Sequence, residues 1–144
     1  MAKDHFVFSF TTKAAPEAVF AYLKNPLNWW TGIYGESIEG SSEVVNDVFS
    51  FTAGNGAHFS RQRLIETVAN RKLVWEVTES KLTFLKNTGE WIGTRFSFEV
   101  EQQQEMTTVT FTHHGLVPEI ECYKSCTGGW TQYLNQLRAH FNGA

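Results

Sequence analysis

The sequence has few cysteines and no long apolar run. Only 2 of its 144 residues are cysteine, which excludes a disulfide framework, and without a signal-peptide pattern they favour a reducing, cytoplasmic setting. No stretch approaches the roughly 20 apolar residues that a membrane span needs. A chain of this length buries about 68–70% of its unfolded surface, so we expect one domain over residues 1–144 that needs no metal or cofactor to hold its core.

Basic charge and catalytic motifs are also scarce. The chain has 12 Lys and Arg against 15 Asp and Glu, a net charge of -3, and its densest basic stretch is Arg61-Gln-Arg63. Nucleic-acid binding normally needs a concentrated basic surface, so we expect no such partner. Nothing has the form of a Ser-His-Asp set, a phosphate-binding glycine loop or a paired-carboxylate motif. These absences favour a binding protein over an enzyme.

Aromatic residues are abundant, at 15% of the chain, with 5 Trp and 12 Phe. Many of them alternate with polar residues, as Phe6, Phe8 and Phe10 do, and a period of two predicts a strand with one buried face. Between about residues 36 and 114 such segments follow one another across short turns, which is typical of an antiparallel meander. The predicted strands cover 5–10, 47–52, 58–68, 73–78, 91–101 and 107–114.

Two regions have helical spacing instead. Residues 15–24 carry a proline in the first turn and an apolar stripe, and a second short turn is expected at 27–30. Residues 119–142 repeat apolar side chains every three or four positions, which predicts an amphipathic helix about 36 Å long. Such a helix must bury its stripe against the sheet, so the sequence predicts an α+β domain.

Three local stretches, in this order, resemble the helix-grip fold of the START-like (SRPBCC) superfamily, most closely its group of activators of the heat-shock-protein-90 ATPase. The resemblance rests on Ala15-Pro-Glu-Ala-Val-Phe-Ala-Tyr-Leu23 followed by Trp29-Trp30, on Arg71-Lys-Leu-Val-Trp75, and on Thr110-Phe-Thr-His-His-Gly-Leu116 followed by Gly128-Gly-Trp130, Leu134 and Leu137. With the order of the strands, it covers nearly the whole chain.

The resemblance implies a curved antiparallel sheet of about six to seven strands wrapped around a long C-terminal helix, with two short helices after the first strand. It also implies a cavity between helix and sheet. Members of the superfamily bind lipids, hormones or aromatic molecules, some are cyclases or hydrolases, and the named group assists a chaperone. Fold alone does not choose among these activities.

Several inward-facing residues of the predicted sheet and helix could line that cavity. A pocket of flat apolar groups suits an apolar or aromatic ligand, whereas the alternative is a filled core. The residues expected to contact a ligand are Trp75, Phe98, Phe111, Tyr123, Thr127 and Trp130.

Two polar residues could anchor a ligand in the same space. His113 falls on the inward face of its strand and could orient a ligand or act as an acid or base, since its unperturbed pKa is near 6.5. The alternative is a histidine that is hydrogen-bonded within the fold. Arg61 could meet a ligand carboxylate or carbonyl, whereas the alternative is a cross-strand pair on the solvated face, with Arg63 and Glu76 as neighbours.

Gly128 and Gly129 stand inside the predicted helix, where each costs roughly 1 kcal/mol relative to alanine. We expect close packing of a neighbouring element to offset this cost, with a pocket entrance as the alternative.

Cys122 and Cys126 are four residues apart and share a helix face. With His114 nearby, a zinc site is conceivable, but tetrahedral zinc draws on tighter ligand pairs and no fourth ligand is evident. We therefore expect thiols and no metal.

The sequence thus favours a binding module that holds an apolar or aromatic small molecule, lipid-like or polyketide-like, between sheet and helix. Two alternatives stay open. One is a cyclase- or hydrolase-type enzyme that uses His113, and the other is an interaction protein that assists a chaperone.

Overall fold

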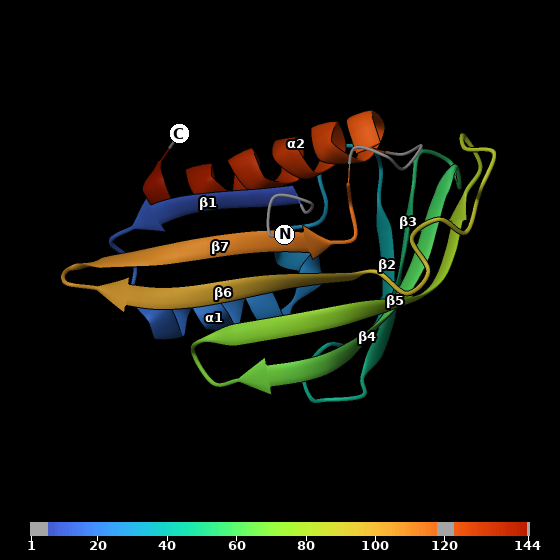
Figure 1. The fold of residues 1–144 in the computed structure, drawn as a ribbon. Coiled ribbons are helices and arrows are strands. Elements are labelled where there is room, and N and C mark those ends of the chain that lie inside the picture. The colour runs from blue at the N-terminus through green and yellow to red at the C-terminus, as the bar shows by residue number, and fades with distance from the viewer. Residues whose placement is uncertain (1–5, 118–122, 144) are drawn as a thin grey trace.

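The computed structural model describes residues 6–117 and 123–143 and contains one curved antiparallel sheet of seven strands (Figure 1). The order across the sheet is β1-β7-β6-β5-β4-β3-β2, so β2 to β7 form a meander and β1 joins it beside β7. The strands are β1 (Phe6–Thr12), β2 (Ser37–Gly40), β3 (Val48–Ala53), β4 (His58–Val68), β5 (Lys72–Leu82), β6 (Arg95–Gln103) and β7 (Met106–His114).

Two α-helices and a short 3-10 turn accompany the sheet: α1 (Pro16–Lys24), η2 (Pro26–Asn28) and α2 (Tyr123–Asn142). Pro16 occupies the first turn of α1, and the Asn25 side chain accepts the Leu27 N–H at the start of η2. The C-terminal end of α2 meets α1, where the rings of Tyr22 and His140 stack 4.1 Å apart. This is the predicted helix-grip α+β architecture, although the predicted helical residues 119–122 lie outside the described residues. Neither α-helix is long and apolar enough, over the residues described, to cross a membrane.

The strand predicted from residue 91 begins later, because β6 starts at Arg95. Gly93 has a φ of +86°, which favours glycine and turns the chain just before the strand. The Thr94 hydroxyl donates to the Trp91 carbonyl oxygen at 2.7 Å and closes this turn. The prediction was therefore wrong for residues 91–94, and Trp91 belongs to the loop between β5 and β6.

Aromatic rings fill much of the space between the sheet and α2. Four of them, hereafter the aromatic row, follow one another in the order Phe51, Trp30, Trp130 and Trp91. Neighbouring ring centroids are 3.8, 5.1 and 5.9 Å apart, and neighbouring ring planes differ by 12°, 20° and 6°. The row joins β3, the segment after η2, α2 and the β5–β6 loop, so it fixes four distant parts of the chain against one another.

Candidate functional site

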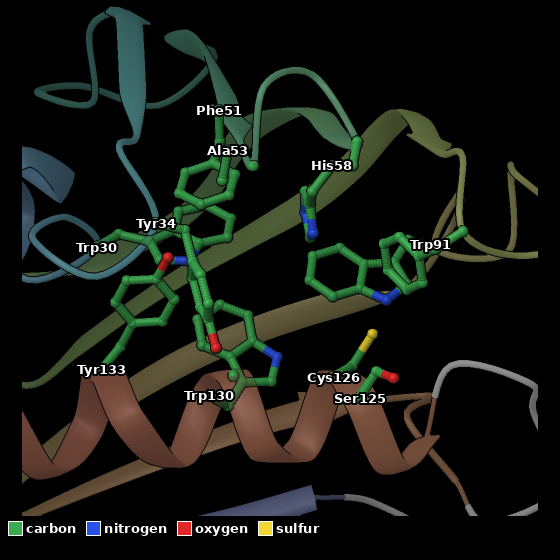
Figure 2. A pocket seen from close by; sticks show the side chains of 14 residues that line it. Trp30, Tyr34, Phe51, Ala53, His58, Trp91, Ser125, Cys126, Trp130 and Tyr133 are labelled. Carbon is green, nitrogen blue, oxygen red and sulfur yellow. The ribbon is translucent and has the colours of Figure 1, made fainter.

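A pocket of about 240 Å³ lies under the N-terminal half of α2, between this helix, β3 and the start of β4 (Figure 2). None of its lining residues is Asp, Glu, Lys or Arg. The pocket is lined by Trp30, Tyr34, Phe51, Ala53, Gly54, Ala57, His58, Phe84, Trp91, Ser125, Cys126, Gly129, Trp130 and Tyr133.

The wall and the rim of this pocket differ in exposure. All four rings of the aromatic row line it, and each of these side chains is at most 2% exposed. Tyr34 and Phe84 also line it, but they are 46% and 48% exposed, so they form its rim. A flat molecule that enters past the rim therefore meets ring faces and edges on its way in.

The glycine pair of α2 has a different role from the one expected. A Cβ atom at Gly128 or Gly129 would meet nothing within 4 Å, so no neighbouring element packs closely on either residue. The expectation of close packing was wrong. Gly129 lines the pocket and Gly128 does not, so the missing side chain at position 129 leaves space open at the pocket.

Two buried nitrogen atoms on the pocket wall have no hydrogen-bond partner among the described residues. They are His58 Nε2 at the start of β4 and Trp91 Nε1 in the β5–β6 loop. Both side chains reach into the pocket in Figure 2, and their ring centroids are 4.8 Å apart. Burial lowers the pKa of His58 to about 4, so its imidazole is neutral at pH 7.

A carboxylate holds the segment before β2 against α2. Glu36 accepts the Tyr133 hydroxyl and the backbone N–H groups of Gly32, Ile33 and Tyr34. Burial acts to raise the pKa of Glu36, but these hydrogen bonds outweigh it and the pKa is lowered; burial and the Glu36 carboxylate together raise the pKa of Tyr133. The Tyr34 side of the rim is therefore tied to the helix.

Of the ligand contacts predicted from the sequence, Trp130 lines the pocket. Trp75, Phe98 and Phe111 are at most 1% exposed in the adjoining core and do not line it. Tyr123 packs partly buried against the same core, and the Thr127 hydroxyl donates to the Lys124 carbonyl oxygen. The binding roles of these five residues stay predictions.

His113 is fully buried within a chain of hydrogen bonds. Trp130 Nε1 donates to its Nδ1 at 3.0 Å, and Nε2 lies 2.9 Å from the Thr94 hydroxyl. Because that hydroxyl donates to the Trp91 carbonyl oxygen, Nε2 must carry the proton in this network. Both nitrogens of the neutral imidazole therefore have hydrogen-bond partners within the protein. This is the arrangement that the sequence left as the alternative to a ligand-binding or catalytic His113.

Arg61 lies outside the pocket and pairs with Glu79 across β4 and β5. Its neighbour Arg63 is 3.6 Å from Glu76, which is also 3.8 Å from Arg95. These are the cross-strand pairs of the solvated face that the sequence left as the alternative. A role for Arg61 in binding stays a prediction, and the lining of the pocket does not support it.

Cys126 is buried, lines the pocket and is disulfide-bonded. The expectation of a thiol was therefore wrong for this residue. Cys122 lies outside the described residues. Within 6–117 and 123–143, no three His, Cys, Asp or Glu residues are grouped so that they could hold a metal ion.

Sequence reasoning missed most of the pocket. His58 has the same strand parity as Ser60 and Gln62, which are buried, but all three are polar, so no apolar alternation in the sequence marks this face as the inner one. Trp91 was assigned to a strand, so its position on a loop above the helix could not be foreseen. Two signals pointed to this region: Trp130, which was expected to contact a ligand, and the glycine pair, for which a pocket entrance was the alternative.

These features define a protein of the START-like, helix-grip class, with its pocket between the sheet and the C-terminal helix. Residues 13–142 match the family model described as "Activator of Hsp90 ATPase homolog 1-like protein". The chain therefore belongs to this family. Comparison with curated proteins finds no match.

Solved structures share the fold. The Aha1 dimer from Colwellia psychrerythraea is similar with a TM-score of 0.73 and 22% identity, over 95% of each chain. A protein from Chromobacterium violaceum has a TM-score of 0.71 and 18% identity, over 98% of this chain and 99% of the other. DynU16, from the dynemicin biosynthetic locus, is similar with a TM-score of 0.67 and 12% identity. The matched region spans 97% of this chain and 48% of the DynU16 chain.

Proposed function

We propose that this protein binds a small apolar or aromatic molecule in the pocket under the N-terminal half of α2. The observation that carries the proposal is a pocket with stacked aromatic rings along its wall, an open position at Gly129 and no charged lining residue. Burial of a ligand there would contribute about 25 cal/mol per Å² of apolar surface removed from water.

The volume of the pocket limits the size of the ligand. Drug-sized ligands occupy pockets of about 300–1,000 Å³, and an apolar cavity of about 150 Å³ binds benzene. A pocket of about 240 Å³ therefore fits one or two fused rings. Among the ligands considered from the sequence, a compact aromatic molecule fits better than a sterol or a long acyl chain.

The two glycines of α2 provide a matched test with naphthalene as the probe. Gly129→Leu should fill the pocket and reduce naphthalene affinity at least tenfold, whereas Gly128→Leu, one position away and outside the pocket, should leave it unchanged. Both changes replace glycine by a better helix former, so neither should unfold the protein. Titration followed by NMR would measure the affinities. Equal naphthalene binding by the two variants, or no binding by the unmodified protein, would contradict the proposal.

A chaperone is a second candidate partner, and the family description favours it. In that case the chain should raise the ATPase rate of a purified Hsp90-type chaperone, and Gly129→Leu should leave this effect intact because its side chain points into the pocket. An unchanged ATPase rate at saturating concentrations of the chain would count against the candidate. The enclosed, doubly hydrogen-bonded His113 gives no support to the cyclase- or hydrolase-type alternative.

A further inference from the structure

The buried tryptophans differ in how their indole N–H groups are satisfied. Trp29 donates to the Leu23 carbonyl oxygen at 2.8 Å, Trp75 to the Ser42 hydroxyl at 2.9 Å, and Trp130 to His113 Nδ1 at 3.0 Å. Trp91 is only 2% exposed, yet its Nε1 has no acceptor among the described residues. Trp30 also lines the pocket, but among the described residues it is Trp91 whose indole N–H is both fully buried and without an acceptor.

An open donor at this place is costly. About 90% or more of buried polar groups in proteins are hydrogen-bonded, and a buried donor without a partner destabilises the fold. Trp91 is held by its stacking on Trp130 and by the turn that Gly93 and Thr94 form, and its side chain lines the pocket (Figure 2). An indole nitrogen only donates, so the missing partner must be an acceptor.

His58 supplies the second open atom. Its Nε2 is buried without a partner, and its ring meets that of Trp91 at 84°. The low pKa of His58 keeps the ring neutral near pH 7, and a neutral imidazole nitrogen either accepts or donates according to its tautomer. The pocket wall thus combines one donor, Trp91 Nε1, with one atom that can donate or accept, His58 Nε2.

The absence of charged residues from the lining restricts the charge that the ligand can carry. No lysine or arginine lines the pocket, and the nearby Arg61 pairs with Glu79 on the outer face. A ligand carboxylate would enter a poorly solvated site without a counter-ion, which is strongly unfavourable. A hydroxyl group suits the site better, because it is uncharged and both accepts and donates.

We propose that the ligand is an uncharged, compact aromatic molecule with at least one hydroxyl group, whose oxygen accepts the Trp91 Nε1–H while His58 Nε2 offers a second polar contact. This inference rests on the proposed function, and it adds the chemical class of the ligand.

Three probes of similar shape test it: naphthalene, 1-naphthol and 1-naphthoate. One added hydrogen bond contributes about 0.5–1.5 kcal/mol, so the unmodified protein should bind 1-naphthol about 2- to 10-fold more tightly than naphthalene, and should bind 1-naphthoate least. Trp91→Phe keeps an aromatic ring but removes the donor, so it should bring the ratio of the 1-naphthol and naphthalene affinities to about one, whatever its effect on the naphthalene affinity itself. Ile92→Ala, at the exposed neighbouring position, is the control and should preserve the preference.

A second readout needs no variant that might misfold. The indole N–H resonance of Trp91, assigned in the unmodified protein by its NOEs to the Trp91 ring protons, should shift downfield with 1-naphthol and not with naphthalene. Equal affinity for 1-naphthol and naphthalene, or an unshifted Trp91 resonance at saturation, would overturn this inference and leave the proposed function standing. If none of the three probes binds, the proposed function fails with it.

Discussion

The two halves of α2 cover the sheet in different ways. In the C-terminal half Leu134 and Leu137 are at most 2% exposed, and His140 stacks on Tyr22 of α1. In the N-terminal half three small residues, Ser125, Cys126 and Gly129, line the pocket beside Trp130. The same helix thus covers a packed core at one end and borders a pocket at the other (Figure 2).

The difference follows from what lies opposite each half. α1 lies beside the C-terminal half, where Tyr22 contacts the rings of His140 and Phe141, so large side chains fill that end. Opposite the N-terminal half lie the rings of the aromatic row. These rigid rings and Gly129 leave the pocket unfilled. Side-chain size along one helix therefore separates a stabilising region from a binding region.

The largest effect should come from the packed half. Leu137→Ala removes a side chain that is 2% exposed, and such changes in a close-packed core cost about 2–5 kcal/mol. Urea denaturation would measure the loss in free energy of unfolding. A loss below about 1 kcal/mol would show that the C-terminal half is not packed as described.

His58 should make stability depend on pH at the pocket end. Its folded-state pKa is about 4 against an unfolded value of 6.5, so the unfolded chain binds more protons between these values. Stability should therefore be complete above pH 6.5 and should fall as the pH drops toward 4, by up to about 3 kcal/mol from this residue.

The variant His58→Gln should lose this part of the pH dependence, whereas His140→Gln, on the exposed face of α2, should keep it. Urea denaturation of the three proteins at pH 7, 5.5 and 4 makes the comparison. Identical pH profiles for the unmodified protein and His58→Gln would mean that the His58 ring is not enclosed.

Glu36 ties the rim to the centre of α2, so its effect should be intermediate. Glu36→Gln removes a charged acceptor from Tyr133 and from three backbone N–H groups, and should cost about 1 kcal/mol at neutral pH. Because the folded-state pKa of Glu36 is lowered, this stability should be present above the ordinary glutamate pKa of about 4.3 and should disappear as the pH falls through the folded value. Equal denaturation midpoints for Glu36→Gln and the unmodified protein at pH 7 would show that the hydrogen bonds of Glu36 do not stabilise the fold.

The smallest expected effect is a gain. Gly128→Ala and Gly129→Ala should each raise the free energy of unfolding by about 0.5–1 kcal/mol, because alanine is the better helix former and a Cβ at either site meets no atom within 4 Å. Thermal or urea denaturation would measure it. A loss of stability at Gly129 alone would mean that a neighbour does pack there.

The fold could be predicted because its signals are periodic. The alternation around Phe96 and Phe98 and the stripe through Trp130 and Leu137 each report a buried face. The pocket could not be predicted in the same way, since Trp91 reaches it from a turn and His58 from the first residue of a strand. Neither position has a pattern of its own, and their meeting depends on how a loop folds over the helix.

The central claim is that the space under the N-terminal half of α2 takes up a small aromatic guest. Intermolecular NOEs between naphthalene protons and the protein test it most directly. The account predicts NOEs to the rings of Phe51, Trp130 and Tyr133, which all line the pocket. NOEs confined to the outer face of the sheet, or to residues beside Tyr22 and His140 at the packed end, would contradict it.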